Sequence, residues 1–273
     1  MSESLSLRFL YRTAPGRELL KLLVMPWVSD AAAKYMASPL SHWMIGYYRK
    51  KYRISLDGCE KHAFASFNEF FMRKKHLDIR TDDRAVISPC DGFLSIYQID
   101  EKLRMRIKHS TYTVGGLLED TDLARQFAGG LCCIFRLEPQ HYHHYLYAVS
   151  GRIRQQKRIP GVLHCVRPIA CEQFPVYVRN SREYTLLEHP VLGRIVQMEI
   201  GAMLVGKICN EPGTGTAVQG AEKGHFEYGG STIVLLLQKD AAQLLPRFRR
   251  FLDTGRELPI AIGQAFAATA KTN

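Results

Sequence analysis

The stretch 227–237 constrains the fold most, because an apolar, β-branched run directly follows two glycines. The run 232–237 has the length and composition of a buried strand. Gly229 and Gly230 predict a turn into that strand, since glycine reaches backbone conformations that other residues avoid. The hydroxyl of Ser231 is therefore expected where a bent backbone meets a rigid strand.

Two interpretations of Ser231 follow from these residues alone. In the first, it is an ordinary serine after a glycine turn. In the second, its hydroxyl attacks the preceding peptide bond, because Gly230 has no side chain to shield its own carbonyl carbon. A strained turn would favour that attack by raising the ground state toward the transition state. The rest of the chain has to decide between the two.

The composition is that of a globular, basic protein. The chain has 273 residues, of which 46% are hydrophobic and 23% charged, enough for one large domain or for one domain with an appendage. Its formal net charge of +11 favours an anionic partner. Because no DNA- or RNA-binding signature is present, we expect no nucleic acid and consider an anionic lipid surface instead.

Cysteine usage and the N-terminal residues bear on the compartment. The seven cysteines form no CxxC pair and no disulfide-like framework, which indicates a reducing environment. Arg8, Arg12, Arg17 and Lys21 interrupt the N-terminal apolar stretch, so it lacks the pattern of a signal peptide. No apolar run reaches the roughly 18–20 residues of a membrane span. We therefore expect a peripheral membrane protein on the cytoplasmic side.

Residues 1–60 are predicted to form an amphipathic, helical region. Apolar residues are interleaved with Lys and Arg as far as Pro26-Trp27, and a second segment carries Trp43 and ends in Arg49-Lys50-Lys51. Such faces are typical of helices that lie on an anionic membrane surface. They are also typical of amphipathic helices docked on their own protein core. Both interpretations stay open at this point.

A short helix is predicted to begin near residue 67. Ser66 is a suitable N-cap, and Glu69 lies three residues later, as in a capping box. Phe67, Phe70 and Phe71 then form one apolar face. This pattern favours a packed helix over a binding motif.

From Ala85 onward, short β-like runs are separated by turns, which predicts a β-rich domain. We therefore expect an α+β chain in two parts, the helical region 1–60 and a β-rich catalytic domain 61–273. The predicted strands lie near residues 85–98, 104–109, 131–137, 143–149, 161–165, 175–179, 183–188, 192–209, 215–219 and 231–238.

An acid lies in a turn within the first of these strands. The sequence Ser88-Pro-Cys-Asp-Gly92 is a structurally routine turn. Its carboxylate, Asp91, would also suit the role of orienting a histidine and stabilising its charge, as the acid does in a Ser-His-Asp triad. The sequence alone leaves both roles open.

The densest group of titratable residues is the segment 139–145, Pro-Gln-His-Tyr-His-His-Tyr. In an extended chain His141 and His143 share one face and His144 takes the other. Histidine suits proton transfer near neutral pH, so one of them is a candidate catalytic residue. A bound metal is not expected, because no acid or thiol completes the set nearby in the sequence.

Other residues and motifs carry less information. His164 and His225 are further candidates for the same pocket, although a lone histidine is more often structural. No G-x-S-x-G elbow surrounds Ser231, and no G-x-x-x-x-G-K-[ST] phosphate loop is present. A serine hydrolase built from Asp91, His143 and Ser231 nevertheless stays as an alternative.

Six short stretches are each weak signals alone, but together, in this order along the chain, they are a strong one. They are Phe67-Asn-Glu-Phe-Phe-Met-Arg73, Ser88-Pro-Cys-Asp-Gly92, Tyr142-His143, Asn180-Ser-Arg-Glu-Tyr-Thr185, Gly201-Ala-Met-Leu-Val-Gly-Lys-Ile208 and Lys223-Gly-His-Phe-Glu-Tyr-Gly-Gly-Ser-Thr232. Taken together, they resemble the phosphatidylserine decarboxylase family over about residues 10–265. The resemblance implies a β-rich fold with sandwich-hybrid features, preceded by membrane-associating helices.

The resemblance also implies that the chain cleaves itself between Gly230 and Ser231, giving the pieces 1–230 and 231–273. Attack by the Ser231 hydroxyl forms an ester, and elimination followed by hydrolysis leaves a covalent pyruvoyl group at residue 231 and releases ammonia. In the family this group forms a Schiff base with the substrate amine. It then serves as the electron sink for loss of CO2.

The substrate that the resemblance implies is phosphatidylserine, converted to phosphatidylethanolamine and CO2 in phospholipid biosynthesis. We expect the reaction at an anionic membrane surface, with the two cleaved pieces associated and assembled into a higher oligomer of that pair. Two alternatives stay open. One is a pyruvoyl decarboxylase of another amino-acid-bearing substrate, and the other is an uncleaved, inactive relative that binds lipid.

One position departs from the family pattern. Many members carry Tyr-His-x-x-His, whose second histidine is tied to self-cleavage, but this chain has Leu146 at that position. His143 matches the first histidine. We therefore predict that His143 is the base for cleavage, with Asp91 orienting it and His144 as the alternative base.

Overall fold

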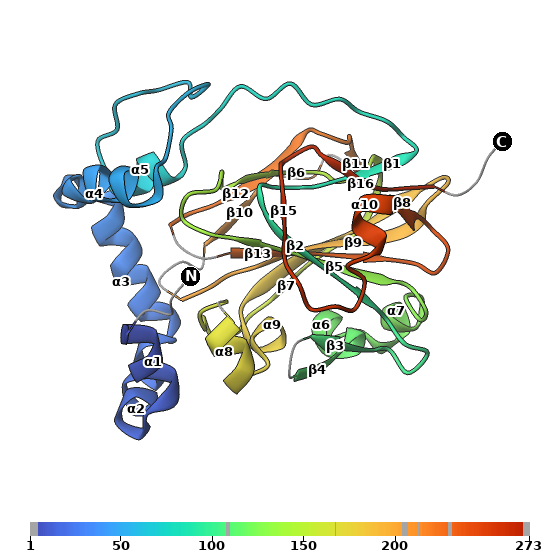
Figure 1. The fold of residues 1–273 in the computed structure, drawn as a ribbon, viewed down its shortest axis with the longest axis horizontal. Coiled ribbons are helices and arrows are strands. Elements are labelled where there is room, and N and C mark those ends of the chain that lie inside the picture. Colours follow the sequence, from blue (N-terminus) through green and yellow to red (C-terminus); the bar gives the residue numbers. More distant parts are fainter. Residues whose placement is uncertain are drawn as a thin grey trace.

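The computed structural model describes residues 5–107, 110–166, 168–203, 207–211, 213, 215–228 and 231–269. Helices precede and flank several antiparallel sheets, so the chain has the predicted α+β class (Figure 1). The helices are α1 (Leu5–Arg12), α2 (Ala14–Leu23), α3 (Pro26–Ala37), the 3-10 turn η1 (Pro39–Ser41), α4 (Trp43–Tyr52), α5 (Phe67–Phe71), α6 (Val114–Leu118), α7 (Thr121–Arg125), α8 (Pro168–Gln173), α9 (Val176–Arg179) and α10 (Pro246–Arg249).

Local signals set the ends of the N-terminal helices. Thr13 caps α2, where its Oγ1 accepts a hydrogen bond from the Gly16 N–H at 3.1 Å, as N-cap threonines commonly do. Pro26 begins α3, at a position where a helix needs no N–H donor. Arg53 ends α4 in the left-handed conformation, with a φ of 52°. The predicted helical character of this region is confirmed.

Part of the surface of these helices packs on the rest of the protein. Leu10 and Tyr11 of α1 and Leu20 of α2 are buried in one apolar cluster with residues of the large sheet. The Cys165 backbone N–H donates to the Tyr11 hydroxyl oxygen at 3.0 Å. Docking on the protein's own core is therefore confirmed for these side chains. The same region also exposes large apolar side chains, which are Leu5, Phe9, Leu19, Leu22, Met25, Trp27, Tyr35, Leu40, Trp43 and Tyr47.

The short helix α5 forms where the sequence predicts it. Ser66 Oγ accepts a hydrogen bond from the Glu69 N–H at 3.2 Å, and the Glu69 carboxylate accepts one from the Ala65 N–H at 2.6 Å. The phenylalanines of α5 pack with α4 in one apolar cluster, so residues on both sides of position 60 share a core. The division of the chain into two parts at residue 60 stays a prediction.

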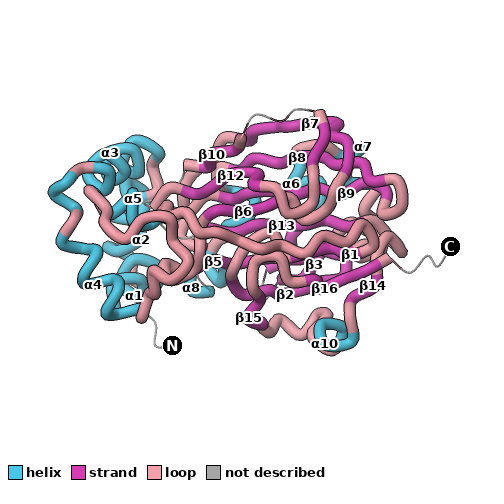
Figure 2. The backbone as a smooth tube through the Cα atoms, turned by 90° about the horizontal axis from the view of Figure 1, so that it is seen from above, coloured by secondary structure: helices cyan, strands magenta, loops and turns pink. Residues whose placement is uncertain are grey.

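The two ends of the molecule differ in secondary structure. Figure 2 shows the N-terminal helices at one end and the sheets at the other. Within the described residues, no helix combines the length and the apolar character that crossing a bilayer requires. The seven cysteines, all of them in described ranges, form no disulfide bond.

An eight-stranded antiparallel sheet forms the centre of the β-rich part. β13 lies inside it, paired with β9 on one side and with β5 on the other, and all of its residues are buried. This is the buried strand that the apolar run after Ser231 predicts. In sheet order the strands are β11 (Thr216–Ala217), β7 (Gly151–Ile159), β8 (Arg182–His189), β9 (Gly193–Ile200), β13 (Ser231–Leu237), β5 (Leu131–Leu137), β2 (Gly92–Gln98) and β15 (Leu258–Ile260).

Smaller antiparallel sheets complete the β-rich part. The one that matters most for the site contains β10 (Ile208–Asn210), β12 (Glu222–Phe226) and β6 (His144–Leu146), with β12 in the middle. The others contain β1 (Ala85–Ile87), β16 (Ala265–Ala268) and β14 (Gln243–Leu244), and the hairpin of β3 (Arg104–Ile107) and β4 (Ser110–Thr113).

Side chains that alternate along β13 divide the core in two. Ile233 and Leu235 on one face pack in a cluster with the β10-β12-β6 sheet, which we call the inter-sheet core. Val234 and Leu236 on the other face pack toward α1, α2 and α8, and we call this cluster the helix-side core. Because side chains two residues apart share a face of a strand, Ser231 faces the same side as Ile233, toward the inter-sheet core.

Two of the strand predictions are wrong. Residues 176–179 form helix α9, whose first turn is closed by hydrogen bonds from the Val178 and Arg179 N–H groups to the Pro175 carbonyl. The segment 161–165 contains only an isolated bridge at Val162. Two longer predicted runs each contain two strands: 85–98 contains β1 and β2, and 192–209 contains β9 and the start of β10. Apolar, β-branched composition is a weak guide where tertiary packing decides the local conformation.

One long strand was missed. β7 has the sequence Gly-Arg-Ile-Arg-Gln-Gln-Lys-Arg-Ile, in which half-buried and exposed residues alternate. It lies near one edge of the large sheet and pairs with β8 and β11. Its mostly polar composition hides the alternation that a half-buried strand requires, because the side chains on its inner face include Gln and Lys.

Candidate active site

Ser231 is the first residue of β13 and is fully buried. It pairs with Leu137 of β5, and the next residue, Thr232, pairs with Ile200 of β9. Its Oγ has no hydrogen-bond partner among the described residues, although a buried hydroxyl usually has one. Gly230, the other half of the predicted cleavage site, lies outside the described residues. The sheet thus fixes Ser231 from its C-terminal side.

His143 lies just before β6 and is fully buried. Its Nδ1 is 2.9 Å from the His141 carbonyl oxygen. Because a carbonyl oxygen only accepts hydrogen bonds, Nδ1 carries the proton, and Nε2 keeps its lone pair and has no partner among the described residues. Burial, and then the charge of Arg73, lower the pKa of His143 well below its ordinary value. The ring is therefore neutral near pH 7 and can accept a proton.

Phe71 connects His143 to the segment that leads to Ser231. Its ring centroid lies 3.8 Å from that of His143 and 5.3 Å from that of Tyr228. The Phe226 N–H also donates to the His143 carbonyl at 3.0 Å. The histidine and the chain three residues before Ser231 are thus held by one aromatic side chain. α5, predicted only as a packed helix, helps to build the site.

Arg73 holds the histidine segment from the same side. It is only 2% exposed, and its Nη2 donates to the carbonyl oxygens of Gln140 and His141 at 3.1 and 3.3 Å. No role for this arginine was predicted from the sequence. The one signal that could have indicated it is its place at the end of the stretch Phe67–Arg73. Nothing in the local sequence reveals a contact with residues nearly seventy positions away.

His144 is already engaged through both ring nitrogens. Its Nε2 donates to the Met72 carbonyl at 2.8 Å, and its Nδ1 lies 2.7 Å from a Glu222 carboxylate oxygen. Both ring nitrogens of His144 therefore already have hydrogen-bond partners. Between the two neighbouring histidines, the geometry favours His143 as the base.

Three side chains lie close enough together to be considered as metal ligands: His144, Glu222 and His225. Their spacing in the sequence did not indicate this group. One ligand atom of each lies within 4.8 Å of the others. The contact of 2.7 Å between His144 and Glu222 has the length of a charge-assisted hydrogen bond, and Lys74 Nζ lies 3.4 Å from the same carboxylate. Although burial opposes the shift, these two cations lower the pKa of Glu222. The group is best described as an ion-pair network.

Asp91 lies in the turn before β2, where its Oδ1 accepts a hydrogen bond from the Ile262 N–H at 2.9 Å. The acceptor that holds the His143 ring is the His141 carbonyl, not this carboxylate. The charge of Asp91 does reach His141, because burial lowers the pKa of His141 and Asp91 opposes that shift. An orienting effect of Asp91 on His143 would act through His141, and it stays a prediction.

Leu146 fills the position at which the family resemblance places a second histidine. It is buried in β6, and its N–H donates to the Pro89 carbonyl at 2.8 Å, next to the Asp91 turn. An apolar side chain cannot take up a proton. Leu146 therefore supplies no base at this position.

The two remaining candidate histidines do not join His143. His164 stacks on Phe174 with ring centroids 4.6 Å apart and lies 6.3 Å from Tyr11, beside the helix-side core. Burial, and then the charge of Arg179, lower the pKa of His164 to about 4. His225 instead stacks on His144 at 5.0 Å. These contacts do not support the expectation that both histidines share a pocket with His143.

Comparison with known proteins identifies the family. A family model described as phosphatidylserine decarboxylase matches residues 67–266. The phosphatidylserine decarboxylase proenzyme 2 of Clostridium acetobutylicum is 38% identical over 96% of this chain and 91% of its own length. The corresponding proenzymes of Ruminiclostridium cellulolyticum and Clostridium novyi are 35% and 33% identical, over 95% and 86% of this chain and 89% and 82% of their own lengths.

The matched region contains each of the residues from which the candidate site is built. It begins with the first residue of α5 and includes the His143 segment, the Asp91 turn and the strand that starts at Ser231. The word proenzyme in the names of the relatives describes proteins that are processed after synthesis. By the extent of these matches, this chain belongs to the phosphatidylserine decarboxylase family.

Proposed function

We propose that this chain is a self-processing decarboxylase that converts phosphatidylserine to phosphatidylethanolamine and CO2. The observation that carries the proposal is the state of Ser231, which is fully buried at the start of the central strand and whose hydroxyl has no partner among the described residues. A histidine whose pKa is lowered by burial, and whose Nε2 likewise lacks a partner in the described part of the chain, lies in the aromatic cluster that holds the chain leading to Ser231. These are the nucleophile and the base that cleavage between Gly230 and Ser231 requires.

In this proposal His143 Nε2 takes the proton of the Ser231 hydroxyl. The His141 carbonyl keeps the ring in the tautomer that has its lone pair on Nε2, and burial keeps the ring neutral. In this proposal Asp91 helps to orient His143, and its charge acts on the neighbouring His141 side chain, whose pKa it raises against the lowering by burial. General-base assistance of this kind contributes about 10²–10⁴-fold to a rate. Because both ring nitrogens of His144 already have hydrogen-bond partners, His144 serves as part of the scaffold.

The residues around Ser231 fit a covalent pyruvoyl group made from that serine. Its hydroxyl is fully buried and has no partner among the described residues, and β5 and β9, both within 1–230, hold β13 from either side. When present, the pyruvoyl group supplies a carbonyl that takes up the substrate amine and accepts electrons as CO2 leaves. The sheet's part is to hold residue 231 in place and to exclude water from it.

The two cleaved pieces stay associated in this proposal. The piece 231–273 supplies β13 to the centre of the large sheet, and its β15 and β16 pair with β2 and β1 of the larger piece. Cutting the chain before Ser231 breaks none of these hydrogen bonds. The layering of a large sheet against a small one suits the sandwich-hybrid fold that the resemblance implies. Assembly of the pair into a higher oligomer stays a prediction.

The N-terminal helices are proposed to hold the enzyme on an anionic membrane at the cytoplasmic side. Among the described residues, every large, exposed apolar side chain except Val191 and Val218 belongs to residues 5–47. Such concentrated exposure marks a binding surface. Trp and Tyr within it, with basic residues alongside, suit the interfacial zone of a bilayer.

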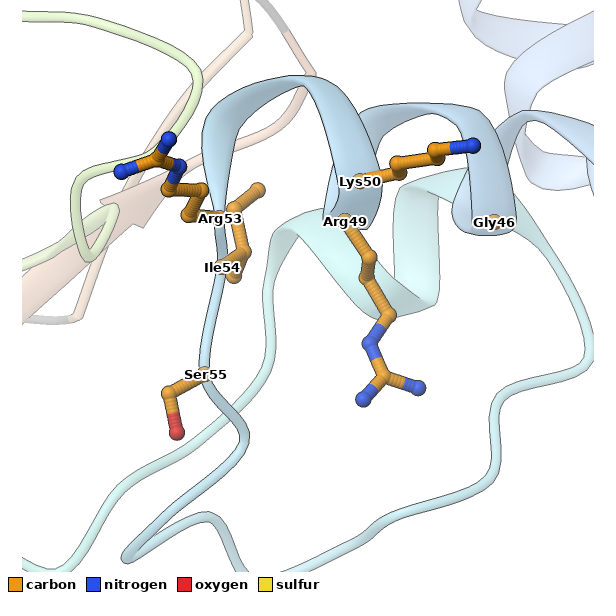
Figure 3. Close-up of a pocket in the computed structure, with 6 residues that line it drawn as sticks. All are labelled: Gly46, Arg49, Lys50, Arg53, Ile54 and Ser55. Carbon is orange, nitrogen blue, oxygen red and sulfur yellow. The ribbon is translucent and has the colours of Figure 1, made fainter.

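The basic end of α4 extends this surface. Arg49, Lys50 and Arg53 line a shallow surface pocket of about 440 Å³. Figure 3 shows that the ends of Lys50 and Arg53 extend in opposite directions, so these charges form a broad rim instead of converging on one point. A broad basic rim suits the diffuse negative charge of a lipid surface.

The alternatives have less support. An uncleaved lipid-binding relative would rest on Leu146 alone, whereas Ser231 and His143 are both present and buried. A serine hydrolase has no support from the sequence around Ser231, which lacks the G-x-S-x-G elbow. A different amino-acid-bearing substrate would not explain the exposed apolar residues of the N-terminal helices.

The function is tested by replacing the nucleophile. We expect Ser231→Ala to give one full-length chain with no release of CO2 from phosphatidylserine in vesicles, because neither the ester nor the pyruvoyl group can form. Thr232→Val is the matched control, since that neighbouring hydroxyl is also buried and has no partner in the part of the chain that the structure describes. It should cleave and turn over normally. Two normal pieces and full turnover in Ser231→Ala would end the proposal.

The base is tested by following cleavage of freshly translated chain. We expect His143→Gln to slow cleavage by about 10²–10⁴-fold, whereas His144→Gln should still cleave. Because the pKa of His143 is lowered below 6.5, the neutral base persists as the pH falls through 6.5, and the rate should decline only at lower pH. Normal cleavage in His143→Gln together with a block in His144→Gln would move the assignment to His144.

Membrane binding is tested by a surface variant that leaves the core intact. We expect Leu22→Gln, Trp27→Gln and Trp43→Gln together to weaken binding to vesicles containing phosphatidylserine by about tenfold or more, since less apolar area enters the interface. The control Val191→Gln with Val218→Gln removes the exposed apolar side chains outside that region. Equal vesicle flotation of the two variants would show that the N-terminal helices do not mediate membrane binding.

A further inference from the structure

A buried ion pair lies between the large sheet and the β10-β12-β6 sheet, and the reaction chemistry does not use it. Lys223 of β12 and Glu199 of β9 are each fully buried, with Nζ and Oε2 2.5 Å apart. Lys223 Nζ also donates to Asn210 Oδ1 at 2.8 Å. Burying two charged groups costs free energy, so this ion pair needs a physical explanation.

Hydrogen bonds extend this pair into a network that joins the two sheets. Gln197 of β9 donates from Nε2 to the Leu146 carbonyl at 2.9 Å and to Glu199 at 3.3 Å, and it accepts from the Ala148 N–H at 3.1 Å. Asn210 of β10 donates to Glu183 of β8 at 3.0 Å. We call the side chains of Glu183, Gln197, Glu199, Asn210 and Lys223 the inter-sheet clamp.

The register of the large sheet places the clamp on the Ser231 face. Glu199 pairs with Ile233, and Gln197 pairs with Leu235. Directly paired residues share a face, and so do residues two apart on one strand. Glu199 is therefore a diagonal neighbour of Ser231 on the inter-sheet side, a separation that long side chains can bridge.

The strands that the clamp holds are those that carry the proposed base and lead to the nucleophile. Gln197 binds the β6 backbone, which begins one residue after His143. Lys223 lies in β12, whose Phe226 N–H binds the His143 carbonyl and whose chain continues toward Ser231. The clamp thus fixes the small sheet against the sheet that holds Ser231.

We propose that the inter-sheet clamp is a positioning device that sets His143 against Ser231 for self-cleavage. The inference rests on the proposed function. With Leu146 in place of a second histidine, cleavage depends on one base, and a displacement of about 1 Å can cost about 100-fold in rate. Lys223 and Glu199 act through the strands they hold and are positioning residues, not catalytic ones.

The test separates positioning from stability. Replacing a buried ion pair by apolar side chains of similar volume is often neutral or stabilising, so Lys223→Met with Glu199→Met should fold. Gln197 keeps the Leu146 carbonyl as a partner, and Asn210 keeps the Tyr145 hydroxyl and Glu183. Stability is measured in a Ser231→Ala background, where all chains are uncleaved. Cleavage of translated full-length chain at 230/231 is measured with Ser231 present.

We expect the Met/Met variant to keep its thermal midpoint within a few degrees of the parent and to cleave at least about tenfold more slowly. Lys223→Arg, which keeps the charge and the donors, should cleave faster than the Met/Met variant. The control Arg182→Met removes a buried charge that binds the Leu117 and Val178 carbonyls. Arg182 pairs with Ile200 and so lies on the helix-side face of the large sheet, opposite to the clamp. It should lower the midpoint and leave the cleavage rate of the folded chain unchanged.

Cleavage of the Met/Met variant at the parental rate would overturn the inference. If that variant does not fold, Lys223→Gln with Glu199→Gln keeps polar groups at both positions and is measured in its place. Failure of both to fold would show that the pair maintains the fold itself, and the positioning role would be rejected. A parent chain that never cleaves contradicts the proposed function, whereas a parent that cleaves no faster than the variant contradicts only the clamp.

Discussion

The pairing of β13 inside the large sheet is the constraint on which the rest of the structure depends. β5 and β9 bind it along its whole length, and its first residue is Ser231. The Ser231 hydroxyl is thereby buried at a fixed place, without a partner among the described residues, while two glycines precede it in the sequence. The same pairing is compatible with the proposed cleavage just before the strand. In that proposal the new end stays in the sheet, because its hydrogen bonds come from the other piece.

The second sheet begins one residue after His143, the proposed base. The His141 carbonyl selects the tautomer of His143, and burial lowers the pKa of its ring, which favours the neutral form. His144, one residue later, instead has hydrogen-bond partners on both of its ring nitrogens. The two neighbouring histidines thus have different surroundings, and those of His143 suit the proposed role of base.

Features set by local sequence could be predicted, and features set by distant contacts could not. The strand after Ser231, the N-terminal helices and the Ser66 cap follow from composition and spacing. α9 was missed because packing turned a β-branched run into a helix. β7 was missed because pairing with its neighbours places a mostly polar run in the large sheet. Glu222 beside His144, and Glu199 beside Lys223, join residues 78 and 24 positions apart. No local pattern announces such partners, and the contacts of Asp91 likewise differ from the direct bond to His143 that a triad suggests.

The most direct test of the account is the intact mass of the purified protein under denaturing conditions, before and after treatment with borohydride. The account predicts two pieces divided between Gly230 and Ser231, with the smaller piece gaining the mass of a reduced carbonyl. A single full-length chain that borohydride leaves unchanged would contradict it. That result would mean that a buried serine and a neutral histidine, without the second histidine that Leu146 replaces, do not suffice for self-cleavage.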